Sequence, residues 1–108
     1  MKVIITLGSN QNQEENISKA QKRLREIFGN ILFSELKWTD AIGIVSDKFL
    51  NCIGTFETFY PQNVIEHYLK QIETEFGDSH ENHKKGLVLI DLDLIKYGNK
   101  TIREVIWL

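Results

Sequence analysis

Two stretches of the chain repeat apolar residues at the three- and four-residue spacing of an amphipathic helix, and each ends at a glycine. The first follows Asn12, which with Glu15 three residues later is typical of a helix N-terminus, and it ends at Gly29. The second follows Pro61, which suits the first turn of a helix, and it ends at Gly77. The apolar stripes comprise Ile17, Ala20, Leu24, Ile27 and Phe28, then Val64, Ile65, Tyr68, Leu69, Ile72 and Phe76. Each helix therefore needs an apolar surface on which to pack.

Segments rich in β-branched and aliphatic residues flank the helices and predict that surface. We expect strands over residues 2–7, 31–38, 48–59, 86–97 and 101–107, with loops at 39–47 and 78–85. The resulting order β-α-β-β-α-β, with a terminal hairpin, matches the ferredoxin-like arrangement of two helices on one face of an antiparallel sheet. The sequence thus predicts the α+β class and a single domain over residues 1–108.

The composition narrows the class of protein. Hydrophobic residues make up 42% of the chain and charged residues 26%, which is ordinary for a globular protein. The net charge of -2 and the lack of a basic block argue against a nucleic-acid partner. No window approaches a membrane span, and the apolar run at residues 3–7 is too short for a signal peptide. Cys52, the only cysteine, is expected to pack in the core, and we expect a cytoplasmic protein without membrane contact.

Two carboxylates share one face of the predicted strand 86–97. The even positions from Val88 to Leu94 are apolar, so Asp91 and Asp93 point together to the opposite face. Side chains at this spacing lie roughly 7 Å apart at Cβ, and their repulsion calls for a compensating cation. Mg²⁺ meets this need, because it accepts one or two carboxylates and takes further oxygens from substrate phosphates. The alternative is an ordinary solvated sheet face, although apolar residues share it: Leu87, Leu89 and Ile95.

Short motifs follow one another in a fixed order along nearly the whole chain. They are Leu7-Gly8-Ser9-Asn10, Phe49-Leu50-Asn51, Ile72-Glu73, Ile90-Asp91-Leu92-Asp93-Leu94 and Tyr97-Gly98. In this order and spacing the sequence resembles the 6-hydroxymethyl-7,8-dihydropterin pyrophosphokinase family, whose members transfer diphosphate from ATP to a pterin alcohol in folate biosynthesis. The aspartate motif before Tyr97-Gly98 is the most specific part of the resemblance.

The resemblance implies a role for each matching residue. Asp91 and Asp93 would hold two Mg²⁺ ions that bridge the phosphates of the co-substrate ATP. Phe49 would stack on the pterin ring and Asn51 would hydrogen-bond its edge, whereas Glu73 falls on the nucleotide side. The remaining matches are Gly8, Thr39 and Ile42 around the pterin pocket. Lys84 and Lys85 match no family position but are candidates for phosphate contacts, because they could supply point charges there. A core aromatic and a plain turn glycine are the alternatives for Phe49 and Gly8.

The chain departs from the family pattern where arginines normally bind phosphates. Asp78 and His80 stand at the positions of an arginine pair, in a loop that also contains His83 and that we expect to be solvated rather than to bind a metal. Lys85-Gly86-Leu87-Val88 stands where the family has a W-G-P-R-like stretch, and the family's second pterin-stacking aromatic would lie beyond Leu108. Trp107 lies too early to match that aromatic and is expected to pack. The alternative function is therefore a non-catalytic family member that binds a small ligand or a protein, and a homo-oligomer formed through the terminal strand is left open.

Overall fold

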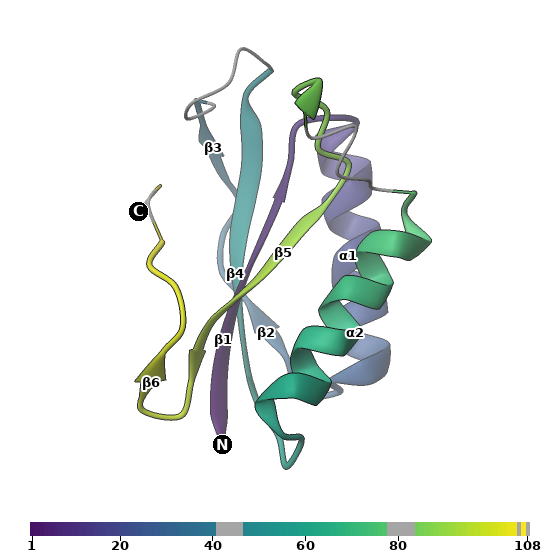
Figure 1. Ribbon diagram of the computed structural model, residues 1–108. Coiled ribbons are helices and arrows are strands. Elements are labelled where there is room, and N and C mark those ends of the chain that lie inside the picture. The colour runs from purple at the N-terminus through teal and green to yellow at the C-terminus, as the bar shows by residue number, and fades with distance from the viewer. Residues whose placement is uncertain (41–46, 78–83, 106, 108) are drawn as a thin grey trace.

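One antiparallel sheet forms the centre of the protein, seen in a computed structural model that describes residues 1–40, 47–77, 84–105 and 107 (Figure 1). The strands are β1 Lys2–Ser9, β2 Leu32–Phe33, β3 Lys37–Thr39, β4 Phe49–Glu57, β5 Asp91–Tyr97 and β6 Lys100–Thr101. Their order is β2-β4-β1-β5-β6, and β3 pairs with a different part of β4. The central order is that of a ferredoxin-like fold, which confirms the predicted class.

Two helices cover one face of this sheet, and each buries the stripe that the sequence predicts (Figure 1). Helix α1, Gln13–Ile27, packs on β1 and β4, whereas α2, Gln62–Glu75, packs on β5. Asn12 precedes α1 as expected, but its side chain makes no capping hydrogen bond, and Glu15 instead pairs with Lys19 at 2.9 Å. The chain leaves α2 through Gly77, whose φ of 74° suits glycine.

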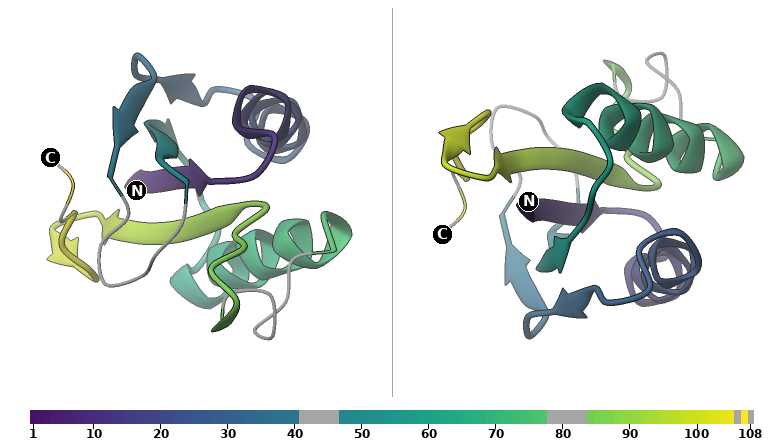
Figure 2. Two further views of the ribbon diagram at one scale, coloured as in Figure 1. Left: turned by 90° about the horizontal axis from the view of Figure 1, so that it is seen from above. Right: turned by 90° about the horizontal axis from the view of Figure 1, so that it is seen from below.

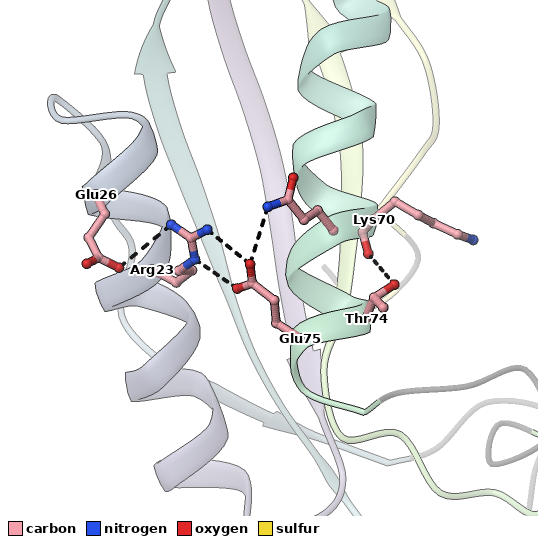
Figure 3. Close-up of polar contacts among 6 residues, drawn as sticks. Arg23, Glu26, Lys70, Thr74 and Glu75 are labelled. Atoms are coloured by element: carbon pink, nitrogen blue, oxygen red, sulfur yellow. Dashed lines mark hydrogen bonds and ion pairs between the residues drawn. The ribbon is translucent and has the colours of Figure 1, made fainter.

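An ion pair joins the two helices (Figure 3). Arg23 Nε donates to Glu75 Oε1 at 2.8 Å and Arg23 Nη2 donates to Glu75 Oε2 at 3.0 Å, so the guanidinium grips both carboxylate oxygens. Glu26 lies on the other side of the same guanidinium, 3.9 Å from Nη1. Within α2, Thr74 Oγ1 donates to the carbonyl of Lys70 at 3.0 Å. Because the side chains of Arg23 and Glu75 are 32% and 38% exposed, this bidentate pair between the helices adds little to stability.

The core lies between the helices and the sheet face beneath them. Cys52 is fully buried there, as predicted, and burial raises the pKa of its thiol. On β5 the even positions Leu92 and Leu94 are buried in the core, so the odd positions face away from the helices. The core residues of the strands are Val3, Ile5, Leu7, Leu50, Cys52, Phe56, Leu92 and Leu94. Strand alternation therefore places Asp91 and Asp93 on the opposite face.

The predicted strand 31–38 is wrong in one respect, because it is interrupted between β2 and β3. At the break the chain still follows β4: the N–H of Ser34 donates to the carbonyl of Ile53 at 2.8 Å. The Ser34 hydroxyl then accepts from the N–H of Ile53, also at 2.8 Å, in place of a backbone carbonyl. A side chain thus replaces one bond of the ladder, and the strand ends there.

The predicted strand 86–97 begins later than expected, at Asp91. The reason is Asn10, which is fully buried after β1. Its Nδ2 donates to the carbonyl of Gly86 and its Oδ1 accepts from the N–H of Val88, both at 2.7 Å. The backbone N–H of Asn10 adds one bond, to the carbonyl of Val88 at 2.9 Å. Because the Asn10 side chain supplies the other two bonds, residues before Asp91 are held without forming a ladder.

The predicted terminal strand is also shorter than expected. Of the terminal residues that the structure describes, Lys100–Thr101 alone pair with β5, and the backbone N–H groups of Ile102 and Arg103 both donate to the carbonyl of Ile95, at 2.8 and 3.3 Å. The segment that follows lies on the side of the sheet away from the helices (Figure 2). Among the residues described, neither helix has the length and apolar character needed to cross a bilayer.

Candidate functional site

Polar residues of neighbouring strands form two rows on the sheet face opposite the helices. The strand register places Asn51 of β4 opposite Gly8 of β1, and Gly8 opposite Asp91 of β5. In the next row Thr6 lies opposite Asp93. Residues that are directly opposite point to the same face of a sheet. The carboxylate pair and the Asn51 amide therefore share one surface, with only the small Gly8 between them.

A cavity of about 300 Å³, here called the sheet cavity, opens on this surface. Six of the residues singled out from the sequence line it: Gly8, Thr39, Phe49, Asn51, Asp91 and Asp93. Phe49 is half-buried in its wall rather than in the core, and Gly8 lies inside β1 rather than in a turn. The alternatives for these two residues, a core aromatic and a turn glycine, are therefore wrong. Ile42 lies outside the described residues.

The Asn51 side chain is held in one orientation. Its Nδ2 donates to Thr39 Oγ1 at 2.7 Å and to the carbonyl of Lys37 at 3.3 Å. Its Oδ1 lies against Gly8, where an added Cβ would come within 3.0 Å of that oxygen. Only 5% of Asn51 is exposed, so its amide is fixed before any ligand enters. Such a preorganised amide suits recognition of a flat, polar ring.

The negative charges of Asp91 and Asp93 are only partly compensated by their surroundings. Burial, the negative charge of Asp91 and a hydrogen bond with Asp91 together raise the pKa of Asp93 from its ordinary 3.8 to about 6. Arg103 opposes this shift, because its Nη1 donates to Asp93 Oδ1 at 2.6 Å. One guanidinium does not offset both the burial and the second carboxylate. The two aspartates thus offer hard oxygen donors that suit a divalent cation with water and phosphate oxygens as its other ligands.

A second cavity, here called the edge cavity, of about 340 Å³, lies beside β5 and α2. Glu73 lines it, and its Oε2 accepts the N–H of Leu92 at 2.8 Å, which caps the outer edge of β5. Lys70, one turn earlier on α2, lines it as well. Asp91, Asp93 and Arg103 line both cavities. The carboxylate pair therefore stands at the junction of two hollows.

Several residues of the site escaped the sequence analysis. Arg103 and Trp107 both line the sheet cavity, although Trp107 was expected only to pack. The hairpin at Gly98 could have indicated them, because a chain that turns there runs back beside β5. By contrast, Lys84 and Lys85 are exposed and line neither cavity. Cavity residues without a sequence signal are Thr6, Asp40, Glu104 and Val105.

The described part of the chain holds no cluster of three or more histidine, cysteine, aspartate or glutamate side chains suited to a metal ion. Asp78, His80 and His83, expected to form a solvated loop, lie outside the described residues. His67 is exposed on α2, as expected for its position outside the apolar stripe. A metal ion at Asp91 and Asp93 would therefore need its other ligands from water or substrate.

The fold and the site define a ferredoxin-like α+β protein with a carboxylate pair in a cavity on the sheet face opposite its helices. The family model of 7,8-dihydro-6-hydroxymethylpterin-pyrophosphokinase matches residues 4–106, and the chain belongs to this family. The resemblance carried by the short motifs is thereby confirmed. Members of the family bind a pterin and use ATP with Mg²⁺. The comparison with curated proteins yields no match.

Proposed function

We propose that this protein transfers diphosphate from Mg-ATP to 6-hydroxymethyl-7,8-dihydropterin in the cytoplasm, as a step of folate biosynthesis. One observation carries the proposal: Asp91 and Asp93 line both the sheet cavity and the edge cavity. A reaction between two substrates needs its charge-stabilising groups at the place where the substrates meet. Membership of the family supports the same activity.

The sheet cavity is assigned to the pterin. Its volume of about 300 Å³ is at the small end of ligand pockets, which suits a bicyclic ring. Phe49 offers an aromatic surface, Trp107 offers a second one, and the fixed Asn51 amide offers its Oδ1 as an acceptor. Stacking on aromatic rings and hydrogen bonds at the ring edge are together the means by which a flat heterocycle is bound.

The edge cavity is assigned to the nucleotide. Lys70 and Arg103 bring positive charge to it, and Glu73 on α2 brings an acceptor for hydroxyl or amino groups. The Leu92 N–H bond fixes the Glu73 carboxylate against β5. A triphosphate extending from this cavity toward the sheet cavity would pass the carboxylate pair.

Asp91 and Asp93 would hold Mg²⁺, and the family resemblance implies two ions. When bound, Mg²⁺ would neutralise charge on the transferred phosphoryl oxygens. The observation that fits this cation is the raised pKa of Asp93, which shows that the negative charge of the pair is only partly compensated. The chain's own contribution is positioning: Asn51 orients the pterin and Arg103 adds positive charge near the phosphates. No side chain needs to form a covalent intermediate, because phosphoryl transfer depends mainly on alignment and electrostatics.

The test is the formation of AMP from ATP and 6-hydroxymethyl-7,8-dihydropterin in the presence of Mg²⁺. We expect turnover by the wild type, and a loss of at least about 100-fold in Asp91→Asn and Asp93→Asn, since one removed electrostatic group typically costs this much. Glu35→Gln, an exposed carboxylate outside both cavities, is the control that should keep wild-type turnover. Turnover no higher in the wild type than in the aspartate variants would refute the proposal.

A second candidate function is a non-catalytic member that binds a small ligand. The scarcity of basic side chains around the carboxylate pair favours this candidate. Of the described residues that line the sheet cavity, Arg103 alone is cationic, and it is already paired with Asp93. Calorimetry with the pterin, and separately with Mg²⁺ and a non-hydrolysable ATP analogue, separates the two functions. Pterin binding without nucleotide binding would favour this candidate. Size measurement in the same samples tests the homo-oligomer.

A further inference from the structure

Arg103 occupies the place of a counter-ion in the carboxylate pair. Its Nη1 lies 2.6 Å from Asp93 Oδ1, the shortest ion pair of the described chain, and it enters from the segment after β6. Arg103 lines both cavities, as the aspartates do. The guanidinium therefore already satisfies one oxygen of the carboxylate that the proposed function assigns to a metal ion.

The backbone of Arg103 is held while its side chain stays accessible. The N–H groups of Ile102 and Arg103 both donate to the carbonyl of Ile95, which anchors the segment to the end of β5. The Arg103 side chain is 62% exposed, whereas that of Asp93 is 26% exposed. A long side chain on a fixed base can change partners without any movement of the sheet. Glu104, which also lines the sheet cavity, follows it directly.

The guanidinium and a divalent cation compete for the negative charge of Asp93, because Arg103 already pairs with Asp93 Oδ1 at 2.6 Å. Both partners are positive, so they also repel each other at ion-pair distance. We propose that Arg103 is an exchangeable counter-ion: it pairs with Asp93 in the absence of a divalent cation, is displaced when the cation binds, and then pairs with phosphate oxygens of the nucleotide. This inference rests on the proposed function, because it takes Asp91 and Asp93 as the metal ligands.

The exchange couples the two ligands in a defined way. Arg103 competes with the metal when no nucleotide is present, so it should weaken binding of the metal alone. Phosphate oxygens accept the planar guanidinium as well as a carboxylate does, so Arg103 should strengthen binding of the metal-bound nucleotide. A residue that merely holds the segment after β6 in place would affect both affinities in the same direction. Opposite signs are the mark of an exchange.

The experiment measures the affinity of Mn²⁺ alone, and then of Mg²⁺ with a non-hydrolysable ATP analogue, by calorimetry on the full chain. For Arg103→Gln we expect Mn²⁺ to bind about 3- to 10-fold more tightly than to the wild type, the effect of losing one competing ion pair. The nucleotide should bind at least about tenfold more weakly. Arg103→Lys keeps the charge without the planar fork, and it should restore Mn²⁺ binding to near the wild-type affinity.

Arg25→Gln is the matched control, because Arg25 lies over the Phe33 ring outside both cavities and carries the same charge. It should change neither affinity by more than about twofold. Mn²⁺ binding to Arg103→Gln that is equal to or weaker than binding to the wild type overturns the exchange but leaves the metal site standing. Mn²⁺ binding to neither protein overturns the metal site and the exchange together. Unfolding midpoints of each variant show that the compared proteins are folded.

Discussion

Gly8 of β1 lies directly opposite Asn51 of β4, and the Asn51 amide fills the space that a side chain at position 8 would occupy. A Cβ at position 8 would lie 3.0 Å from Asn51 Oδ1 and 3.6 Å from the Phe49 ring. Asn51 cannot turn away freely, because its Nδ2 is bonded to Thr39 Oγ1 at 2.7 Å. The shape of the sheet cavity, the side proposed to bind the pterin, is thus set by a residue that offers no functional group of its own.

Gly8→Ala should therefore weaken pterin binding by about tenfold, because the added methyl group pushes the Asn51 amide out of register with its ligand. Stability should fall by less than about 1 kcal/mol, since the displaced atom is a side-chain oxygen. Calorimetry with the pterin and urea unfolding measure the two effects. Gly29→Ala is the control, because nothing lies within 4 Å of a Cβ at that position. Wild-type affinity in Gly8→Ala would show that the contact does not shape the pocket.

Trp107 provides an optical test of the sheet cavity. The chain has two tryptophans, and Trp38 is 49% exposed outside this cavity, so Trp38→Phe leaves Trp107 as the sole tryptophan. Added pterin should quench the remaining emission, and Trp107→Ala should weaken pterin binding about 5- to 20-fold through loss of ring stacking. Trp107→Phe should keep most of the affinity. If Trp38→Phe shows no quenching while calorimetry detects pterin binding, Trp107 does not contact the ring.

The pKa of Asp93 predicts how stability depends on pH in metal-free protein. The folded pKa of about 6 lies above the ordinary 3.8, so between these values the folded state keeps a proton that the unfolded state has released. Stability should therefore decrease as pH rises from about 4 to 6, by on the order of 2 kcal/mol. Urea unfolding with EDTA measures it. Because other carboxylates titrate in the same range, the informative quantity is the wild type minus Asp93→Asn.

The control is Glu35→Gln, which removes an exposed carboxylate. The stability difference between the wild type and this variant should not change with pH in the same way. Mg²⁺ added at pH 7 should stabilise the wild type and not Asp93→Asn, because a ligand that binds only the folded state shifts unfolding by mass action. Equal slopes for the wild type and Asp93→Asn would mean that the charge of this carboxylate is compensated by means other than a proton.

The fold was predictable because its signals are local and repeated. The stripes of α1 and α2 specify which faces are buried, and the alternation in β5 separates Leu92 and Leu94 from the two aspartates. Two of the failures occur where a side chain replaces a backbone partner. Ser34 breaks the predicted strand at 31–38, and Asn10 delays the start of β5. A hydrogen bond between residues about 80 positions apart leaves no periodic trace in the sequence.

The site was predictable only in part, for a similar reason. Residues on strands, such as Asn51 and Asp91, could be assigned to a face by alternation and to a role by family resemblance. Arg103 and Trp107 lie beyond the last regular strand, where only the hairpin turn constrains the chain. Lys84 and Lys85 have the right charge for a phosphate, but the segment that Asn10 holds leaves them outside both cavities. Charge alone therefore did not identify the cations of the site.

Asn10 yields the last prediction, because its buried amide supports the segment that leads into Asp91. Asn10→Ala removes its bonds to the Gly86 carbonyl and the Val88 N–H, both at 2.7 Å, and leaves these buried backbone groups unpaired. We expect a loss of about 2–4 kcal/mol in the free energy of unfolding, measured with urea. Metal binding should weaken as well, since the start of β5 is no longer held against β1.

The chain contains its own control for this variant. Asn30 makes the same pair of bonds to one backbone unit, donating to the Glu57 carbonyl at 3.2 Å and accepting from its N–H at 3.3 Å, but at an exposed position. Water can replace both bonds there, so Asn30→Ala should cost less than about 1 kcal/mol. The two variants delete the same side chain and the same kinds of bond, and they differ in burial. If their costs were equal, burial of the Asn10 amide would not be what fixes the approach to the carboxylate pair.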